Sequence, residues 1–108
     1  MTAAHPLHSL ESVMEHFEYC VGIVVIDHVT FGPDTLFVDH VGFHEAYAEH
    51  MDIGGEGEHP RAPYVEGLEN TSEFPNVVRW LVAHGYRDDD IATAIGGNTL
   101  RALRDAWI

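Results

Sequence analysis

The chain has 108 residues, of which 45% are hydrophobic, so it suffices for one small domain and is not wholly disordered. Eighteen acidic residues face five arginines and no lysine, which gives a formal net charge of −13. Such a surface repels phosphate backbones and anionic lipids, so we expect neither nucleic acid nor a membrane as a partner.

The sequence also argues against membrane insertion and secretion. The longest apolar runs, such as residues 23–26, are too short to span a bilayer, and residues 1–5 lack the basic-then-apolar pattern of a secretion signal. Cys20 is the single cysteine and cannot form an internal disulfide. It falls on the apolar stripe of a predicted helix, so we expect it in the core of a cytoplasmic protein.

The first predicted element is a helix. Ser9 is a candidate N-cap, and apolar residues follow it at helical spacing with glutamates on the opposite side. This pattern predicts a helix over residues 10–21 that ends at Gly22. His16 and His28 accompany apolar elements, and we expect both at the edge of the core.

The second predicted element is a strand within the β-rich stretch 23–31, mainly in its second half. Gly32 and Pro33 end it and leave one carboxylate, Asp34, just beyond its end. Barrel and open α/β enzymes place their chemistry at such strand ends. The alternative interpretation of Asp34 is a residue that caps the turn.

A long loop over residues 35–64 follows, in which we expect a short helix near residues 40–50. His40 and His44 are spaced i, i+4, so a helix would present both imidazoles on one face, as a metal site requires. The alternatives are a solvated acidic loop in which histidine is frequent, or a part of a substrate mouth.

Helical patterns return in the last third of the chain. Ser72 is the expected N-cap of a helix that closes at Gly85, and Asp88 is the expected N-cap of a second, short one. Gly96-Gly97 is expected to break that helix, and Asn98 to cap the last one. The side chains of the last helix that we expect to face inward are Leu100, Leu103 and Trp107.

A fold of four helices, one strand and one long loop is incomplete, because a lone strand cannot satisfy its own backbone groups. We therefore expect part of a larger fold whose helix faces include apolar surface meant for absent neighbours, and hence a tendency to associate, for example as a homo-oligomer. The faces concerned are Phe74/Val78/Leu81 and Leu100/Leu103/Trp107.

Three stretches of the chain resemble the C-terminal part of the membrane (renal) dipeptidase family, zinc peptidases of the amidohydrolase superfamily. They are residues 13–19, residues 27–34 (Asp-His-Val-Thr-Phe-Gly-Pro-Asp), and a third block made of 66–70, 74–76, 85–86, 88–91 and 96–101. The resemblance covers most of the chain apart from residues 35–64.

The resemblance implies an α/β fold, the C-terminal portion of a TIM-like (β/α)8 metal-dependent hydrolase barrel. Residues 1–108 would form a single partial domain, mostly helical, with the last strand region and the closing helices. The implied activity is hydrolysis of a dipeptide substrate at two zinc ions. Asp34 matches the family's aspartate beside the metal-bound water, which implies a catalytic and substrate-binding role in orienting that water and passing on its proton.

The chain departs from the family pattern in two respects. The usual Asp-Phe-Asp-Gly is here Asp34-Thr35-Leu36-Phe37, without the second carboxylate. The family's zinc ligands lie upstream and have no matching position in this chain. Residues 50–52, His-Met-Asp, have the spelling of the family's His-x-Asp motif, but they come after Asp34 and do not follow a strand, so we do not assign them as ligands. We therefore expect the isolated chain to lack the binuclear centre and to be catalytically incompetent.

A second hypothesis is non-enzymatic. The chain would then be a small acidic module that binds a divalent metal or a protein partner through the histidine-rich loop at residues 40–59. In this alternative His40 and His44 are the candidate ligands.

Overall fold

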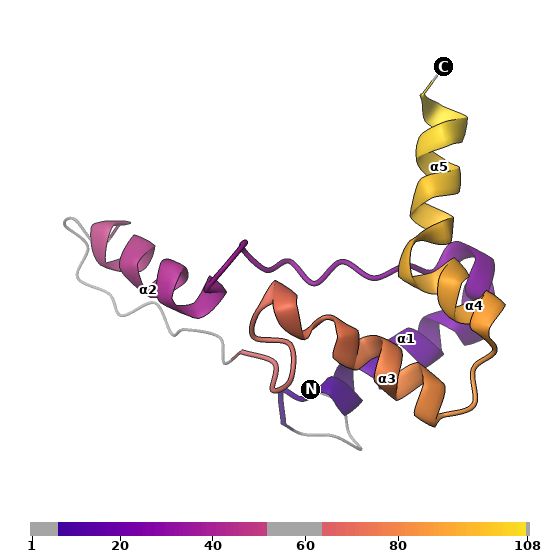
Figure 1. Ribbon diagram of the computed structural model, residues 1–108, viewed down its shortest axis with the longest axis horizontal. Helices are drawn as coiled ribbons and strands as arrows, with labels where there is room; N and C mark the ends of the chain where they lie inside the picture. Colours follow the sequence, from indigo (N-terminus) through magenta and orange to yellow (C-terminus); the bar gives the residue numbers. More distant parts are fainter. Residues whose placement is uncertain (1–6, 52–63, 108) are drawn as a thin grey trace.

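The computed structural model describes residues 7–51 and 64–107 (Figure 1). The helices are α1 (Leu10–Val24), α2 (His40–Met51), α3 (Pro75–Ala83), α4 (Asp88–Ala92) and α5 (Asn98–Ala106), with 3₁₀ turns η1 (Ile26–His28) and η2 (Thr71–Glu73) and a π-helical segment η3 (Thr93–Gly97). No strand occurs in these two ranges. Their β-type pairing is an isolated parallel bridge between Ser9 and Glu66.

Helix α1 begins as predicted and ends later. The Ser9 hydroxyl accepts from the Ser12 amide at 3.4 Å, and the Ser12 hydroxyl accepts from the Ser9 amide at 3.3 Å, so the two serines form a capping box. Gly22 does not end the helix, because the chain keeps its helical hydrogen bonds through Val24. Val25, with φ 59°, terminates it.

The strand predicted over residues 23–31 is wrong. Its first two residues belong to α1, residues 26–28 form η1, and residues 29–36 form an extended segment without a strand partner, interrupted at Asp34, whose φ is 51°. The β-branched residues favour extended backbone, but a ladder needs a neighbouring strand, and the described residues provide none. The described part of this chain is thus helical, and the barrel expected with it is not seen.

The core lies where α1, α3 and the α4–η3 segment meet. Its buried hydrophobic side chains are Met14, Phe17, Val77, Leu81, Ile91 and Ala94. Phe31, from the extended segment, adds an aromatic layer: its ring stacks on Phe17 with centroids 4.6 Å apart and meets Phe74 edge-on at 6.3 Å. The extended segment is therefore held by side-chain packing.

The helix boundaries in the last third differ from the predicted ones. Ser72 lies inside η2, which Asn70 caps, so α3 begins at Pro75, while Gly85 closes it as predicted with φ 79°. The Asp88 side chain makes no cap hydrogen bond, because Asp88 is already the first residue of α4.

Gly96 and Gly97 do not break the chain into separate helices. They lie in η3, which joins α4 to α5 by a widened π turn. Asn98 consequently does not cap α5; its side chain is buried with 5% exposure and turns toward η1. A π turn contains one more residue than an α turn, so it rotates the residues that follow it around the helix axis. This rotation turns the Asn98 side chain into the interior of the molecule.

Several side chains of the expected core lie outside, and those of the last helix form the open apolar face that was expected of a partial fold. Leu100 and Leu103 are about half exposed, at 48% and 47%, and Trp107 is 81% exposed, because α5 projects away from the other helices (Figure 1). Cys20 is exposed as well. The face that Phe74, Val78 and Leu81 were expected to leave open is instead packed against the core.

His16 and His28 are both exposed, so neither is the core-edge histidine expected. Helix α2 lies at the opposite end of the molecule, joined to the core by the extended segment (Figure 1). The Cα radius of gyration is 16.6 Å, where a compact domain of this length has about 13 Å. The molecule is elongated.

Candidate functional site

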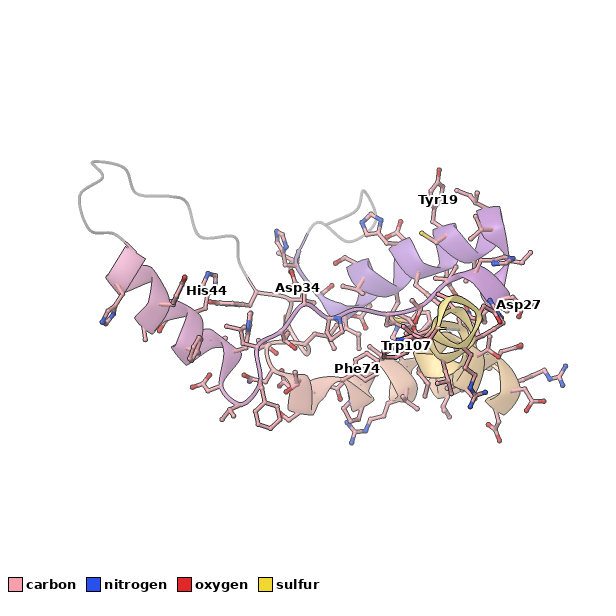
Figure 2. The ribbon with its side chains drawn as sticks, turned by 90° about the horizontal axis from the view of Figure 1, so that it is seen from above. Tyr19, Asp27, Asp34, His44, Phe74 and Trp107 are labelled. Atoms are coloured by element: carbon pink, nitrogen blue, oxygen red, sulfur yellow. The ribbon has the colours of Figure 1, made fainter. Side chains whose placement is uncertain are left out.

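Asp34 lies on the extended segment between the helical core and α2 (Figure 2). Its side chain is exposed, and its backbone adopts the left-handed conformation with φ 51°. A non-glycine residue with positive φ is uncommon, although aspartate tolerates it better than most. The segment thus presents the carboxylate to solvent at a sharp change of backbone direction, beyond the position where the sequence predicted a strand end.

The segment that leads to Asp34 is tied to η3 and α5. The Thr30 hydroxyl lies 3.2 Å from the Ala94 carbonyl, to which it donates, and 2.8 Å from the Thr99 hydroxyl. Asn98 adds two further hydrogen bonds to the carbonyls of Ile26 and Val29, both 2.7 Å long. These bonds join residues more than 60 positions apart in the chain.

His40 and His44 lie on α2 as the i, i+4 spacing predicted, with ring centroids 5.9 Å apart. Tyr64 meets both rings edge-on, and its hydroxyl lies 3.0 Å from His44 Nδ1. His40 Nδ1 accepts a hydrogen bond of 2.8 Å from the Leu36 amide. The three side chains form an aromatic cluster that attaches α2 to the chain on both sides.

This cluster does not fit a zinc centre. Within residues 7–51 and 64–107, no three His, Cys, Asp or Glu side chains gather as metal ligands would. Because His40 Nδ1 accepts from Leu36, its other ring nitrogen carries the proton in the neutral ring and has no lone pair for a metal. Residues 52–59 of the histidine-rich loop lie outside the described residues.

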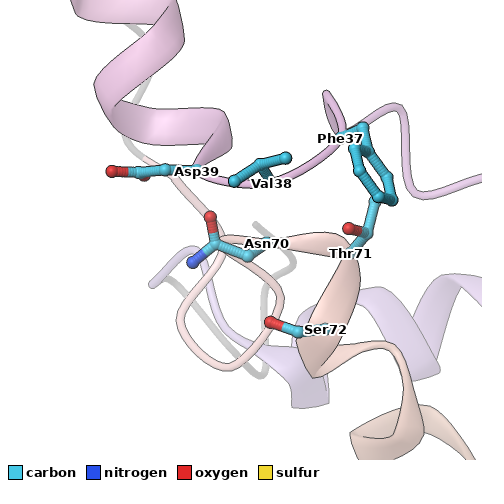
Figure 3. A pocket seen from close by; sticks show the side chains of 6 residues that line it. All are labelled: Phe37, Val38, Asp39, Asn70, Thr71 and Ser72. Carbon is cyan, nitrogen blue, oxygen red and sulfur yellow. The ribbon is translucent and has the colours of Figure 1, made fainter.

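A shallow hollow lies where residues 37–39 lead into α2, beside Asn70 and η2 (Figure 3). Its lining side chains are Phe37, Val38, Asp39, Asn70, Thr71 and Ser72. Asn70 also binds the first turn of α2, because its Oδ1 accepts from the His40 amide at 3.0 Å. Neither Asn70 nor this hollow was predicted from the sequence; the Asn-x-x-Glu pattern of the capping box at residues 70–73 was the available signal.

One tyrosine at the edge of the core has a perturbed pKa. Burial first, then the hydrogen bond to Glu18 and the charges of Glu18 and Asp90, raise the pKa of Tyr86 to about 12. The Tyr86 hydroxyl donates to Glu18 at 3.1 Å. This pair ties α1 to the loop before α4 and lies apart from Asp34.

The sequence matches one family model over nearly its whole length. The family is that of the membrane dipeptidases (peptidase family M19), and the match covers residues 3–107. No solved structure matches the chain. Within the described residues, no helix has the length and apolar character needed to cross a membrane.

Three curated fungal proteins are similar to the chain. Dipeptidase tcpJ of Claviceps purpurea is 31% identical over 81 residues, which is 75% of this chain and 16% of the relative. Dipeptidase ataJ of Aspergillus terreus is 32% identical over 83 residues (77% and 18%), and dipeptidase aclJ of Aspergillus oryzae is 31% identical over 81 residues (75% and 17%). The chain therefore spans about one sixth of the length of these relatives.

Proposed function

The chain belongs to the membrane dipeptidase family, and we propose that it forms the C-terminal part of a dipeptidase-like metallohydrolase that cleaves dipeptides. The family match over residues 3–107 is the observation that carries this proposal. The names of the three curated relatives, all dipeptidases, support the same reaction class.

Asp34 is the residue we assign to the chemistry. A carboxylate that accepts a proton from an attacking water, and passes it to the leaving amine, acts as a general base and then as a general acid. Asp34 suits this role because it is solvent-exposed and follows closely after Thr30 and Phe31, which are anchored to the core. The same carboxylate would contact the substrate amine.

The zinc ions of such an enzyme would need ligands from outside the described residues, since these residues provide no suitable cluster. When bound, zinc supplies polarisation of the scissile carbonyl and a more acidic water. The part assigned to this chain is confined to the exposed carboxylate and the framework that holds it. The non-enzymatic alternative, a metal-binding module built on His40 and His44, is not favoured, because His40 Nδ1 is already an acceptor.

A chimera tests the proposal. Residues 3–107 replace the matching region of dipeptidase tcpJ, and zinc content and hydrolysis of a dipeptide panel are measured for the chimera and for the isolated chain. We expect zinc and hydrolysis in the chimera and neither in the isolated chain. A folded, zinc-loaded chimera without hydrolysis would contradict the proposed function, and stoichiometric zinc with hydrolysis in the isolated chain would contradict the division of roles.

A further inference from the structure

Asn98 and Arg101 lie on one face of α5, one helical turn apart, and both reach the turn η1. The Asn98 amide group donates to the carbonyls of Ile26 and Val29, each at 2.7 Å. Arg101 Nη2 donates to the carbonyl between them in sequence, that of Asp27. Three of four successive carbonyls in this turn therefore accept from two side chains of α5, which lie about 70 residues further along the chain.

Arg101 also sets the orientation of the Asn98 amide. Its Nη1 donates to Asn98 Oδ1 at 3.0 Å, so the oxygen is occupied and the NH₂ group must face the two carbonyls. Asn98 is only 5% exposed, whereas an asparagine at a helix start normally caps the backbone from the surface. A buried amide with all three hydrogen bonds formed holds its partners in one geometry.

The position of η1 sets the start of the segment that carries Asp34. From Val29 the chain is extended, with the Thr30 hydroxyl bonded to η3 and the Phe31 ring stacked on Phe17. No strand among the described residues aligns this segment, so its direction depends on these side-chain anchors. Only Gly32 and Pro33 lie between Phe31, the last anchored residue, and Asp34.

We infer that Asn98 and Arg101 are positioning residues, which fix the turn at residues 26–29 and thereby the direction in which the extended segment presents Asp34. The catalytic meaning of this role rests on the proposed function of Asp34, whereas the positioning itself is measurable in the chain without any activity. The arrangement takes over the alignment that a neighbouring strand would provide.

The test substitutes Asn98→Asp, which keeps the shape of the side chain and its acceptor for Arg101 but removes both donated hydrogen bonds. Asn76→Asp is the control, because Asn76 has a similar arrangement on α3: it accepts from Arg79 at 2.6 Å and donates to one carbonyl, that of Gly67, at 3.0 Å, although it is only half-buried. Both variants introduce one negative charge; Asn98→Asp removes two asparagine-to-carbonyl hydrogen bonds and Asn76→Asp removes one. Only the first touches residues 26–34.

Two measurements decide the outcome. Hydrogen exchange at the His28 and Val29 amides, which form the η1 turn, should become about tenfold faster in Asn98→Asp and stay unchanged in Asn76→Asp. The coupling between the amide and α protons of Asp34, which depends on φ, should change in Asn98→Asp alone. Exchange at the core amide of Leu81 is recorded in the same samples, because a general loss of stability accelerates exchange there too, whereas a local opening of η1 does not.

Unchanged exchange and an unchanged Asp34 coupling in folded Asn98→Asp would overturn the inference. If that variant does not fold, Arg101→Met decides instead: it keeps the aliphatic stem, and it should accelerate exchange at His28 and Val29, with no acceleration overturning the inference. An Asp34→Asn variant that keeps full activity in the chimera would contradict the proposed function and leave the positioning role of Asn98 and Arg101 unaffected, since neither measurement above depends on catalysis.

Discussion

The rings of Phe17 and Phe31 stack with their centroids 4.6 Å apart and their planes at 23°, which joins helix α1 to the extended segment that follows it. This contact attaches the segment to the hydrophobic core, because Phe17 is almost fully buried and Phe31 packs against the same core. The position of the Asp34 segment thus depends on the core of the helical part, and changes in that core should reach it.

The substitution Phe17→Ala should lower the free energy of unfolding by about 3–5 kcal/mol, because it removes a buried ring and leaves a cavity against Phe31. Phe37→Ala is the control: Phe37 is 86% exposed, so its loss should change stability by less than about 0.5 kcal/mol. Urea unfolding followed by circular dichroism measures both. Equal effects of the two changes would contradict the placement of the core.

The raised pKa of Tyr86 predicts a loss of stability in alkali. The neutral phenol is favoured in the folded chain, so its contribution is complete below the ordinary tyrosine pKa of 10.0 and is lost as the pH rises toward about 12. Urea midpoints measured across this window should fall more steeply for the wild type than for Tyr86→Phe. Tyr19→Phe, on the exposed part of α1, is the control and should show the same decrease of the urea midpoint with pH as the wild type. If the midpoint of Tyr86→Phe decreased in parallel with that of Tyr19→Phe, the raised pKa of Tyr86 would be contradicted.

The hydrogen bond at His40 predicts weak and non-stoichiometric zinc binding by the isolated chain, because Nδ1 is engaged with the Leu36 amide and no third ligand lies nearby among the described residues. Calorimetric titration with zinc chloride is the measurement. His44→Ala should leave the titration unchanged. One zinc bound per chain, and lost in His44→Ala, would instead support the metal-binding alternative.

The exposed apolar side chains of α5 predict self-association that depends on concentration. Replacing Leu100 and Leu103 together by Gln should reduce the apparent mass at high concentration without lowering the unfolding temperature, since both side chains are about half exposed. Leu36→Gln, at 42% exposure away from α5, is the control. Sedimentation velocity over a concentration series tests this; a monomeric wild type at every concentration would contradict it.

The amphipathic helices were predictable from sequence, whereas the extended segment was not. The spacing of apolar residues after Ser9 located α1, because that signal is local, and the short helix expected near residues 40–50 corresponds to α2. Residues 23–31 were predicted as a strand from their β-branched side chains, but strand formation depends on a partner elsewhere. The first two residues of that stretch instead continue the helical hydrogen bonding of α1.

The candidate site shows the same division. Asp34 was identified from its position after Gly32-Pro33 and from the family resemblance, and its catalytic role stays a prediction. Asn98 was predicted as a helix cap, because its neighbours in sequence are two glycines. Its contacts with Ile26 and Val29 depend on the π turn at Thr93–Gly97, which no local sequence pattern predicted.

The most direct measurement is the kcat of dipeptide hydrolysis for the chimera carrying Asp34→Asn. We expect a decrease of about 100-fold or more with unchanged zinc content, as for the loss of a general acid–base group. Asp39→Asn, the matched control, should retain kcat, since the amide oxygen can still accept from Gly42 and cap α2. An Asp34→Asn chimera that hydrolyses dipeptides at the parent rate would contradict the role assigned to Asp34.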